Sequence, residues 1–505
     1  MAEVAEQEAA GSNRRIWIVV GIVVLIIAYL VARSVQKKMI ISGLRSEENS
    51  VRVTSAQKLM EMKILTDVLS RQPVPVKRPM IRTLRDMNTE AAADELIALM
   101  KDRNPTVQNE AQFALQRMAP TSIGKLVGAL SNPDLNVKNR AAMALIAIGS
   151  SVLTPVEKDG KQSVPLIDAI ATPAARPGVT RVVTTLRGDV APWLLQKLAD
   201  ESTDPGTKAC AIDILGRLGV QEAAKPIRAM LDAAEVPVPI RNAALVALGR
   251  LRHPDAYALL NAAIADKDPA LVSVAIQGFG ELQNPAAVSL LQKYLFGYNE
   301  ALRDAAVAAL SKIGAPAVPA LAGLVKSPRY EVRIGALRAL EGIDDPRTPG
   351  IIASALKDPD ENVRRMAAEA LGRPGDARGI APLIAALSDP KWRVAARARD
   401  SLAEIGSPAV PALVATLSNA AQSSASFYAQ QALTRIGTSA VPALMSAART
   451  GNVEARQRAV LVLGAIGDSR AVDLLKSLST SDSIPAIRQA AERALKQVQE
   501  GRRIG

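Results

Sequence analysis

The sequence predicts an all-α protein in which a single N-terminal transmembrane helix is followed by a right-handed α-solenoid of about fifteen helical hairpins. Three observations predict this fold class. A charge-free apolar run lies near the N-terminus, and the rest of the chain repeats itself at a nearly constant interval. In addition, 49% of the 505 residues are hydrophobic but only 3% are aromatic, so Ala, Leu, Val and Ile supply most of the apolar volume. Such side chains favour small, repeated helix–helix contacts over one large globular core.

The first element is a predicted membrane anchor. Residues 1–13 are acidic and rich in Ala and predict a disordered tail, whereas residues 14–34 predict a transmembrane helix. The stretch 16–32 carries no charge and spans about 25 Å as a helix, which is short but sufficient for a bilayer. The residues expected to characterise the anchor are Ile16, Trp17, Val24, Leu25 and Tyr29. The Trp and Tyr rings lie near its two ends, where interfacial aromatic residues are common.

Two questions about this segment stay open. A cleavable signal peptide would need an unusually long apolar region, and the polar sequence after it, residues 33–38, offers no convincing cleavage site. We therefore expect an uncleaved, single-pass anchor in the cell (inner) membrane. The excess of basic residues after the stretch favours a cytoplasmic solenoid. An Arg pair before an apolar run is also typical of bacterial export anchors, however, so a periplasmic solenoid is the alternative.

From residue 35 to residue 499 the chain is predicted to form the solenoid, and residues 500–505 form a C-terminal tail. Four segments align almost without gaps, namely 315–344, 345–375, 376–406 and 407–437. Glycines mark the ends of units at intervals of 30 or 31 residues, as at Gly375, Gly406, Gly437 and Gly467. Because neither helix of a unit can bury its apolar face alone, the units must stack side by side.

Each unit predicts two helices. In residues 315–344 the first helix, VPALAGLV, is followed by a polar Ser-Pro turn, and the second helix is VRIGALRALEGI. In most units a Gly then closes the second helix, and a Pro shortly afterwards prevents it from continuing. Residues 150–163 interrupt the period. Their central Asp159-Gly160 predicts a β-hairpin, which could serve in recognition or have no function.

The repeated unit resembles HEAT repeats, and in particular the short phycobilisome-lyase-like HEAT family. The family core L-x-D-P-x-x-x-V-R-x-x-A-x-x-A-L-G is matched from Leu356 through Asp358-Pro359 and Val363-Arg364 to Ala370-Leu371-Gly372. The resemblance covers nearly everything outside the anchor and implies a helical solenoid. It leaves activity open, because repeats of this type serve scaffolds, adaptors, bilin lyases and DNA-repair enzymes alike.

A basic residue recurs just inside the second helix of most units, and three examples are Arg303, Arg333 and Arg364. The resemblance implies that these arginines form a structural ladder, since in similar proteins the equivalent arginine pairs with Asp and with backbone carbonyls between neighbouring repeats. The alternative is a column of like charges that binds phosphates or an acidic partner.

The chain carries few side chains suited to catalysis. Its only cysteine, Cys210, excludes an intramolecular disulfide and Cys-based metal sites, and its only histidine, His253, leaves little for acid–base chemistry. The sequence has no Gly-rich phosphate loop, nucleophile elbow or metal-spaced carboxylate set. Its net charge of +13 is spread over the whole chain, which does not indicate nucleic-acid binding. We therefore expect no enzymatic activity, cofactor, metal or small-molecule substrate.

Aromatic residues in the turns are the best candidates for partner binding. Tyr330 and Trp392 each follow a turn proline by two residues, and a valine two positions further on already supplies the core of each unit. These rings should project from the turn edge, where large rigid side chains often anchor interfaces, unless each ring only covers the neighbouring turn. Basic neighbours would suit an acidic partner. The full set of candidates is Tyr298, Arg329, Tyr330, Lys391, Trp392, Arg393, Asp159 and Gly160. The residues expected to pack internally are Tyr257, Phe279, Tyr294 and Phe296.

Together these features predict a membrane-anchored scaffold or adaptor that binds protein partners, as an accessory, structural or assembly subunit of a bacterial membrane-associated complex. A bilin lyase or isomerase is the alternative that the resemblance implies, and a nucleic-acid-binding HEAT protein is a further one. Activity towards a bilin and its acceptor protein, or salt-dependent binding to duplex DNA, would distinguish these alternatives.

Overall fold

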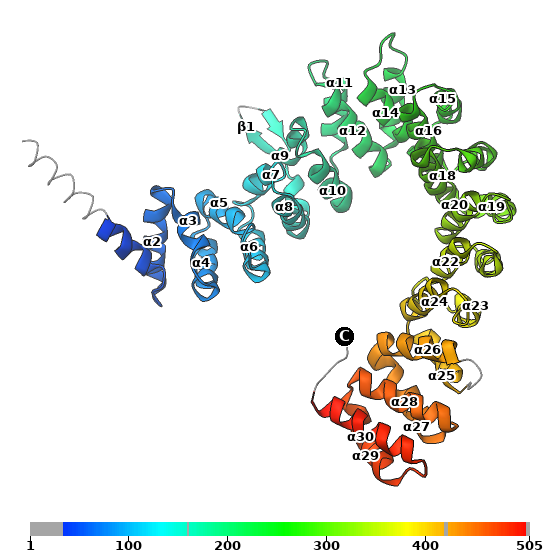
Figure 1. Ribbon diagram of the computed structural model, residues 1–505. Helices are drawn as coiled ribbons and strands as arrows, with labels where there is room; N and C mark the ends of the chain where they lie inside the picture. Colours follow the sequence, from blue (N-terminus) through cyan, green and yellow to red (C-terminus); the bar gives the residue numbers. More distant parts are fainter. Residues whose placement is uncertain (1–33, 159–160, 419–422, 501–505) are drawn as a thin grey trace, which may run out of the picture. The chain divides into compact units, whose positions relative to one another are not determined.

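The computed structural model describes residues 34–158, 161–418 and 423–500, and nearly all of its regular structure is helical (Figure 1). The predicted anchor residues Ile16, Trp17, Val24, Leu25 and Tyr29 lie outside the described residues, as do Asp159 and Gly160. In the part of the chain that is described, no single helix combines the length and the apolar composition needed to cross a membrane. The chain divides into two compact units at Ala247 and Leu248.

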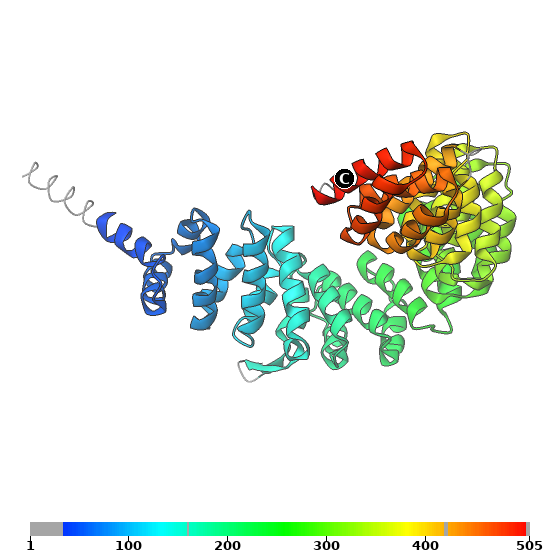
Figure 2. The ribbon, with the colours of Figure 1, turned by 90° about the horizontal axis from the view of Figure 1, so that it is seen from below.

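The first unit is built from stacked helices. They are α2 (Asn49–Glu61), α3 (Leu65–Ser70), α4 (Val74–Met87), α5 (Glu90–Leu99), α6 (Pro105–Arg117), α7 (Ile123–Ala129), α8 (Leu135–Ile148), α9 (Pro165–Asp168), α10 (Arg176–Leu186), α11 (Ala191–Ala199), α12 (Pro205–Leu218), α13 (Ala224–Met230) and α14 (Val238–Arg250), which contains the boundary. Helices α4, α6, α8, α10 and α12 pack on one another in succession. Figure 2 shows the helices of this unit side by side in a row.

The second unit repeats this arrangement with greater regularity. Its helices are α15 (Ala256–Ala263), α16 (Pro269–Leu282), α17 (Val288–Leu291), α18 (Glu300–Ile313), α19 (Val318–Leu324), α20 (Tyr330–Glu341), α21 (Thr348–Ser354), α22 (Glu361–Ala370), α23 (Ile380–Ala386), α24 (Trp392–Ile405), α25 (Val410–Leu417), α26 (Ser423–Ile436), α27 (Val441–Thr450), α28 (Val453–Ile466), α29 (Val472–Ser481) and α30 (Pro485–Gln499). The even-numbered helices pack in succession, and each also packs on the odd-numbered helix before it. The predicted stacking of helical hairpins is therefore confirmed for this unit.

Short 3₁₀ helices and one β-hairpin complete the regular structure. The 3₁₀ helices are η1 (Ser150–Leu153), η2 (Ala169–Ala171), η3 (Gln221–Ala223), η4 (Pro285–Ala287), η5 (Gln292–Phe296), η6 (Ala315–Ala317), η7 (Ala355–Lys357), η8 (Ala377–Gly379), η9 (Ser407–Ala409), η10 (Gly437–Ala440) and η11 (Ser469–Ala471). Strands β1 (Val156–Lys158) and β2 (Lys161–Ser163) pair antiparallel within the insertion, so that Val156 lies opposite Ser163.

Local signals fix where the second helices begin and end. At α22, the Asp360 carboxylate accepts hydrogen bonds from the backbone N–H groups of Asn362 and Val363, which have no partner within the helix. The same kind of cap is supplied elsewhere by Asn104, Asp134, Asp204, Asp268, Asn299 and Asn452. At the end of α24, Gly406 has a φ of 79°, a conformation that Gly adopts at little cost.

The core is made of small aliphatic side chains because the second helices approach one another closely. Gly280 of α16 lies against α18, where an added Cβ atom would stand 2.8 Å from the Cα atom of Ala309. Phe279 is the largest fully buried side chain, and its ring packs edge-on against Tyr257 with the ring centroids 5.3 Å apart. The scarcity of aromatic residues therefore follows from the narrow space between helices.

Candidate protein-binding surface

One candidate surface lies where the second helices of the second unit begin. Tyr330 is the first residue of α20 and Trp392 is the first residue of α24, and α22, which lies between these two helices, begins with Glu361. Helices α20, α22 and α24 pack in succession, so these three residues hold equivalent places along one edge of the unit. We call this edge the turn edge.

The aromatic side chains of the turn edge are exposed. Trp392 exposes 68% of its surface, Tyr330 exposes 45% and Tyr298 exposes 92%. Val332 and Val394, two residues after Tyr330 and Trp392, are completely buried and fill the interior instead. The rings therefore contribute little to the core, and they offer apolar area that a partner could cover.

Two of the three helices at the turn edge begin without a side-chain cap, as α2, α4, α10 and α30 also do. The residues before α20 and α24 are Arg329 and Lys391, and neither side chain caps its helix. Replacing a capping Asp or Asn by a residue that cannot cap costs about 0.5–2 kcal/mol.

Two arginines lie over the exposed rings. The guanidinium carbon of Arg393 is 5.5 Å from the centre of the Trp392 ring, and that of Arg329 is 5.2 Å from the centre of the Tyr298 ring. The Arg329 guanidinium also donates a hydrogen bond of 2.7 Å to the Phe296 carbonyl, which connects neighbouring repeats. These contacts restrict the motion of the rings and of the cations. The entropy lost when a partner binds is therefore smaller.

The charge of the turn edge is partly compensated. Glu361 lies between the basic residues, with its carboxylate oxygens 3.8 Å from Lys391 Nζ and 3.7 Å from Arg393 Nη1. Arg329 Nε is 3.8 Å from a carboxylate oxygen of Glu331. Exposed pairs at such distances are each worth about 0–1 kcal/mol, so a closer acidic group from a partner could replace them.

The prediction that Phe296 packs internally, as Tyr257, Phe279 and Tyr294 are predicted to do, is wrong. Its side chain is exposed. Phe296 is the last residue of η5, and the turn after it leaves the ring outside the helix pair. Tyr294 lies two residues earlier, half-buried, and its hydroxyl donates a hydrogen bond of 3.2 Å to the Ile264 carbonyl.

The predicted arginine ladder lies behind the turn edge. Arg333 and Arg364 are buried, and each reaches a carboxylate in the next repeat. Arg333 Nη2 is 2.8 Å from Asp358, and Arg364 Nε is 2.7 Å from Asp389, an interaction that raises the pKa of the Arg364 guanidinium. Both guanidinium groups also donate to carbonyls of their own turns. Arg303 differs, because its side chain donates only to the Gly297 carbonyl among the described residues.

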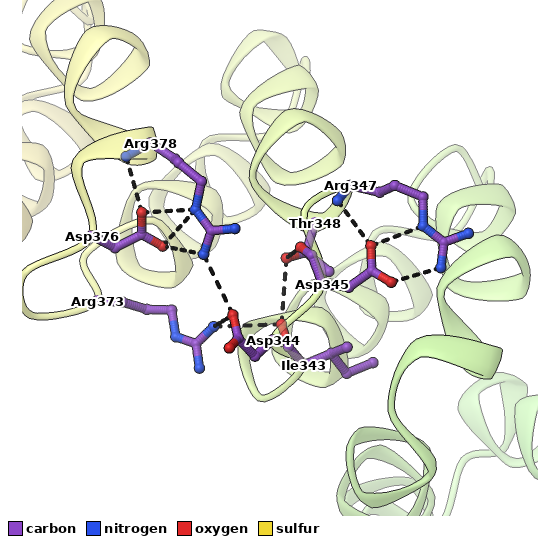
Figure 3. A network of polar contacts seen from close by, with 8 residues as sticks. All are labelled: Ile343, Asp344, Asp345, Arg347, Thr348, Arg373, Asp376 and Arg378. Carbon is purple, nitrogen blue, oxygen red and sulfur yellow. Dashed lines mark hydrogen bonds and ion pairs between the residues drawn. The ribbon is translucent and has the colours of Figure 1, made fainter.

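A second set of Asp–Arg pairs lies in the turns before the first helices (Figure 3). The Asp345 carboxylate accepts hydrogen bonds from the backbone and the guanidinium of Arg347, which lowers the pKa of Asp345 to about 2. Asp376 and Arg378 repeat this arrangement, and Arg378 also reaches Asp344 of the preceding turn at 3.5 Å. These arginines serve the contact between repeats.

Exposed apolar residues that the sequence pattern did not single out also lie at positions equivalent to Tyr330. Leu135, Val238 and Val453 are the first residues of α8, α14 and α28, and all three side chains are exposed. Leu135 lies two residues after Pro133, as Tyr330 does after Pro328, but Val238 and Val453 reach this position only when the units are aligned by the start of the second helix. Leu135 belongs to the first unit, so this feature is not confined to the second.

Cys210 and His253, the only cysteine and histidine in the sequence, both lie in surroundings that suit a structural role. Cys210 is buried, and burial raises the pKa of its thiol, which disfavours the nucleophilic thiolate. His253 Nδ1 accepts a hydrogen bond of 3.2 Å from the Asp255 backbone N–H at the start of a turn. Within residues 34–158, 161–418 and 423–500, no group of three or more His, Cys, Asp or Glu side chains is arranged to hold a metal ion.

Comparison with solved structures finds similarity to importin-beta and to a phycocyanin lyase complex. Yeast importin-beta (Kap95p) is 12% identical, with a TM-score of 0.39, and the match covers 92% of this chain and 72% of that chain. In the structure of Kap95p with RanGDP the identity is 14%, the TM-score is 0.33, and the chain spans 66% of that protein. The complex of CpcE and CpcF of phycocyanin lyase from Nostoc sp. PCC7120 is 23% identical, with a TM-score of 0.27, over 43% of this chain and 91% of that chain.

No curated protein matches the chain significantly. The sequence profile described as HEAT repeats matches five overlapping stretches, which are 191–277, 258–341, 318–403, 348–434 and 410–496. These stretches cover more than half of the chain and nearly all of the second unit's helical residues, and the resemblance to HEAT repeats is thereby confirmed. The chain belongs to the HEAT-repeat family.

Proposed function

We propose that this protein is a membrane-anchored HEAT-repeat scaffold or adaptor, without enzymatic activity, that binds protein partners through the turn edge of its second unit. It would act as an accessory, structural or assembly subunit of a membrane-associated complex. The observation that carries the proposal is the exposure of Tyr298, Tyr330 and Trp392 beside cations that do not cap their helices. Tyr, Trp and Arg are the residues most enriched among those that contribute most of the binding energy of protein interfaces.

An acidic partner fits this surface best. Lys391, Arg393 and Arg329 already contact carboxylates of Glu361 and Glu331 at 3.7–3.8 Å, so the surface accommodates carboxylate groups next to its rings. A partner carboxylate that approaches more closely would keep these cations paired while its neighbours cover the rings. The interface would then combine apolar area with charge-assisted hydrogen bonds.

The membrane anchor is part of the same proposal and rests on the sequence. Residues 16–32 carry no charge, and Arg14, Arg15 and Arg33 bound them. We place the solenoid in the cytoplasm because basic residues are more frequent after the stretch than before it, with the periplasm as the alternative. Protease protection in spheroplasts would distinguish the two locations.

The partner proposal is tested with the full chain in mild detergent. Wild-type protein and the Tyr330→Ala/Trp392→Ala variant are used to capture partners, which are quantified by mass spectrometry and then titrated as purified proteins. We expect at least one acidic partner to bind the variant about 30-fold more weakly, which corresponds to about 2 kcal/mol. The matched control is Phe427→Ala, which removes an exposed ring from α26 instead.

The outcome that contradicts the proposal is equally concrete. Equal partner affinity of wild type and variant would remove the turn edge from the interface. A large drop in melting temperature would assign the rings to packing, which the exposure of Trp392 does not predict.

The anchor is tested by substituting Val24→Arg and Leu25→Arg together. Two charges near the bilayer centre cost several kcal/mol, so the variant should move from the membrane fraction to the soluble fraction. Release of wild-type protein by high salt or alkaline carbonate would show that residues 16–32 do not span a bilayer.

A further inference from the structure

A second exposed surface lies on the first unit, away from the helix starts. Phe113 is the ninth residue of α6 and Met143 is the ninth residue of α8, so both occupy the same position on neighbouring helices. Their exposed fractions are 60% and 48%. The equivalent residue of α4 is Arg82, which is also exposed. These helices thus present a cation and two large apolar side chains in succession. We call this surface the helix-face patch.

A groove runs beside the Phe113 ring. It has a volume of about 160 Å³ and lies between α4 and α6. It is lined by Ile81, Arg82, Arg85, Glu110, Phe113, Ala114 and Arg117. A cavity of about 150 Å³ holds a benzene molecule, so the groove has room for one large apolar side chain.

The patch has unpaired positive charge. The side chains of Arg82 and Arg117 make no ion pair or hydrogen bond with any residue that the structure describes, although both line the groove. The only lining carboxylate, that of Glu110, is already bound by Arg78 Nε at 2.6 Å, and Arg85 pairs with its own neighbour, Asp86. Two cations therefore line the groove, and no carboxylate among the described residues pairs with them.

A third cation extends the patch towards Met143. The Arg140 guanidinium crosses from α8 to α6 and donates hydrogen bonds to the amide oxygens of Gln108 and Asn109, at 2.7 and 2.8 Å. These acceptors are neutral, so the charge of Arg140 also has no carboxylate partner in the described part of the chain. The amides hold the guanidinium in place on the face of α6, where a partner carboxylate would find it preorganised.

We propose that the helix-face patch is a docking site for an acidic segment of a partner protein that places one large apolar side chain in the groove beside Phe113. Carboxylates of the segment pair with Arg82, Arg117 and Arg140, and Met143 adapts to the next apolar residue. This site is separate from the turn edge, lies on the other unit, and does not depend on the function proposed above.

Charge and shape favour a protein segment over other anions. Glu110 and Asp86 lie among the arginines, and they would repel the closely spaced phosphates of nucleic acid or of an anionic membrane. The exposed Phe113 and Met143 side chains offer area that phosphates cannot use. An acidic peptide can place its carboxylates away from Glu110 and Asp86 and its apolar residues against Phe113 and Met143.

The test uses the full chain in mild detergent and a fluorescein-labelled peptide of about sixteen residues, in which Leu recurs every three or four positions among Glu residues. We expect saturable binding in fluorescence anisotropy. Phe113→Ala should weaken it about tenfold, and Arg82→Glu combined with Arg117→Glu should weaken it at least as much and reduce its salt dependence. Because these side chains are exposed, melting temperatures should change little.

Matched controls define the site. Phe427→Ala removes an exposed ring from the second unit, and Arg103→Glu reverses an exposed charge in the turn before α6; both should bind the peptide within about twofold of wild type. A peptide with Ser in place of Leu, and one with Lys in place of Glu, should bind at least about tenfold more weakly.

Several results would overturn the proposal. One is absence of binding to the Leu–Glu peptide, and another is binding that Phe113→Ala leaves unchanged. Binding of single-stranded RNA or of anionic vesicles that requires Phe113 would assign the patch to nucleic acid or membrane. Concentration-dependent self-association of wild type that Phe113→Ala abolishes would assign it to a second copy of the chain.

Discussion

Tyr330 and Arg333 lie one turn apart on α20 but differ in burial, in charge and in the contacts they make. Tyr330 is exposed and has no packing role in the core, whereas Arg333 is buried and joins its repeat to the next through Asp358. The same contrast separates Trp392 from Arg364, which reaches into the turn just before α24. One short turn therefore supplies both the contact that stacks the repeats and the surface that is left for a partner. The two roles predict opposite responses to substitution.

The largest effect is expected for the ladder. Arg364→Ala leaves the Asp389 carboxylate buried without its partner and removes a donor to the Asp358 carbonyl. Breaking one side of a buried ion pair costs about 3–5 kcal/mol, so the variant should unfold at clearly lower urea concentration, as followed by circular dichroism. The matched control is Arg365→Ala, the next residue, whose half-exposed pair with Glu369 is worth less than about 1 kcal/mol. Equal midpoints for the two variants would contradict the distinction between ladder and surface.

The second prediction concerns close packing between repeats. Gly280→Val places a branched side chain where a Cβ atom alone would already stand 2.8 Å from Ala309 Cα, so the helices must move apart. We expect a loss of about 1–3 kcal/mol in the free energy of unfolding, measured by urea denaturation. Gly323→Ala is the opposite control, since nothing lies within 4 Å of its added Cβ atom, and it should stabilise α19 by about 0.4–1 kcal/mol. A stable Gly280→Val variant would mean that the seam between α16 and α18 is loose.

The helical hairpins could be predicted from the sequence because their signals are local. Apolar spacing, turn prolines and closing glycines all lie within one unit, and the four segments between residues 315 and 437 repeat them. The exposure of Tyr330 and Trp392 could be anticipated for the same reason, because a neighbouring valine fills the core position.

The helix-face patch could not be predicted in this way. Phe113 lies in the stretch AQFALQ and Met143 in AAMALI, where an apolar residue among alanines is indistinguishable from the core pattern. Which side of the second helix faces outward depends on how α4, α6 and α8 stack, and stacking is a contact between units. The same reason explains Phe296, whose exposure depends on where η5 ends.

A smaller effect is expected from restoring a helix cap at the turn edge. Lys391 precedes α24 with an extended backbone and no side-chain cap, so Lys391→Asp supplies an acceptor for the free N–H groups of the first turn. We expect a stabilisation of about 1 kcal/mol in thermal or urea unfolding, whereas Lys391→Ala should give none. The same substitution should weaken binding of an acidic partner, because it places a carboxylate beside Trp392. Stabilisation together with unchanged partner affinity would separate the cap position from the interface.

The smallest effect is a pH dependence in the turns that join the repeats. The hydrogen bonds from Arg347 hold the pKa of Asp345 at about 2, below the ordinary value of 3.8. Asp345 therefore contributes stability that is fully present above pH 4 and is lost as the pH falls towards 2, because the unfolded chain takes up the proton first. We expect the melting temperature of Asp345→Asn to lie below that of wild type at pH 5 and to approach it as the pH falls to 2. Asp344→Asn is the control, since the Asp344 carboxylate is exposed and its contacts with Arg378 and Arg373 are long, at 3.5 and 3.7 Å. A difference between wild type and Asp345→Asn that stays constant from pH 5 to pH 2 would show that the charge of Asp345 does not stabilise the turn.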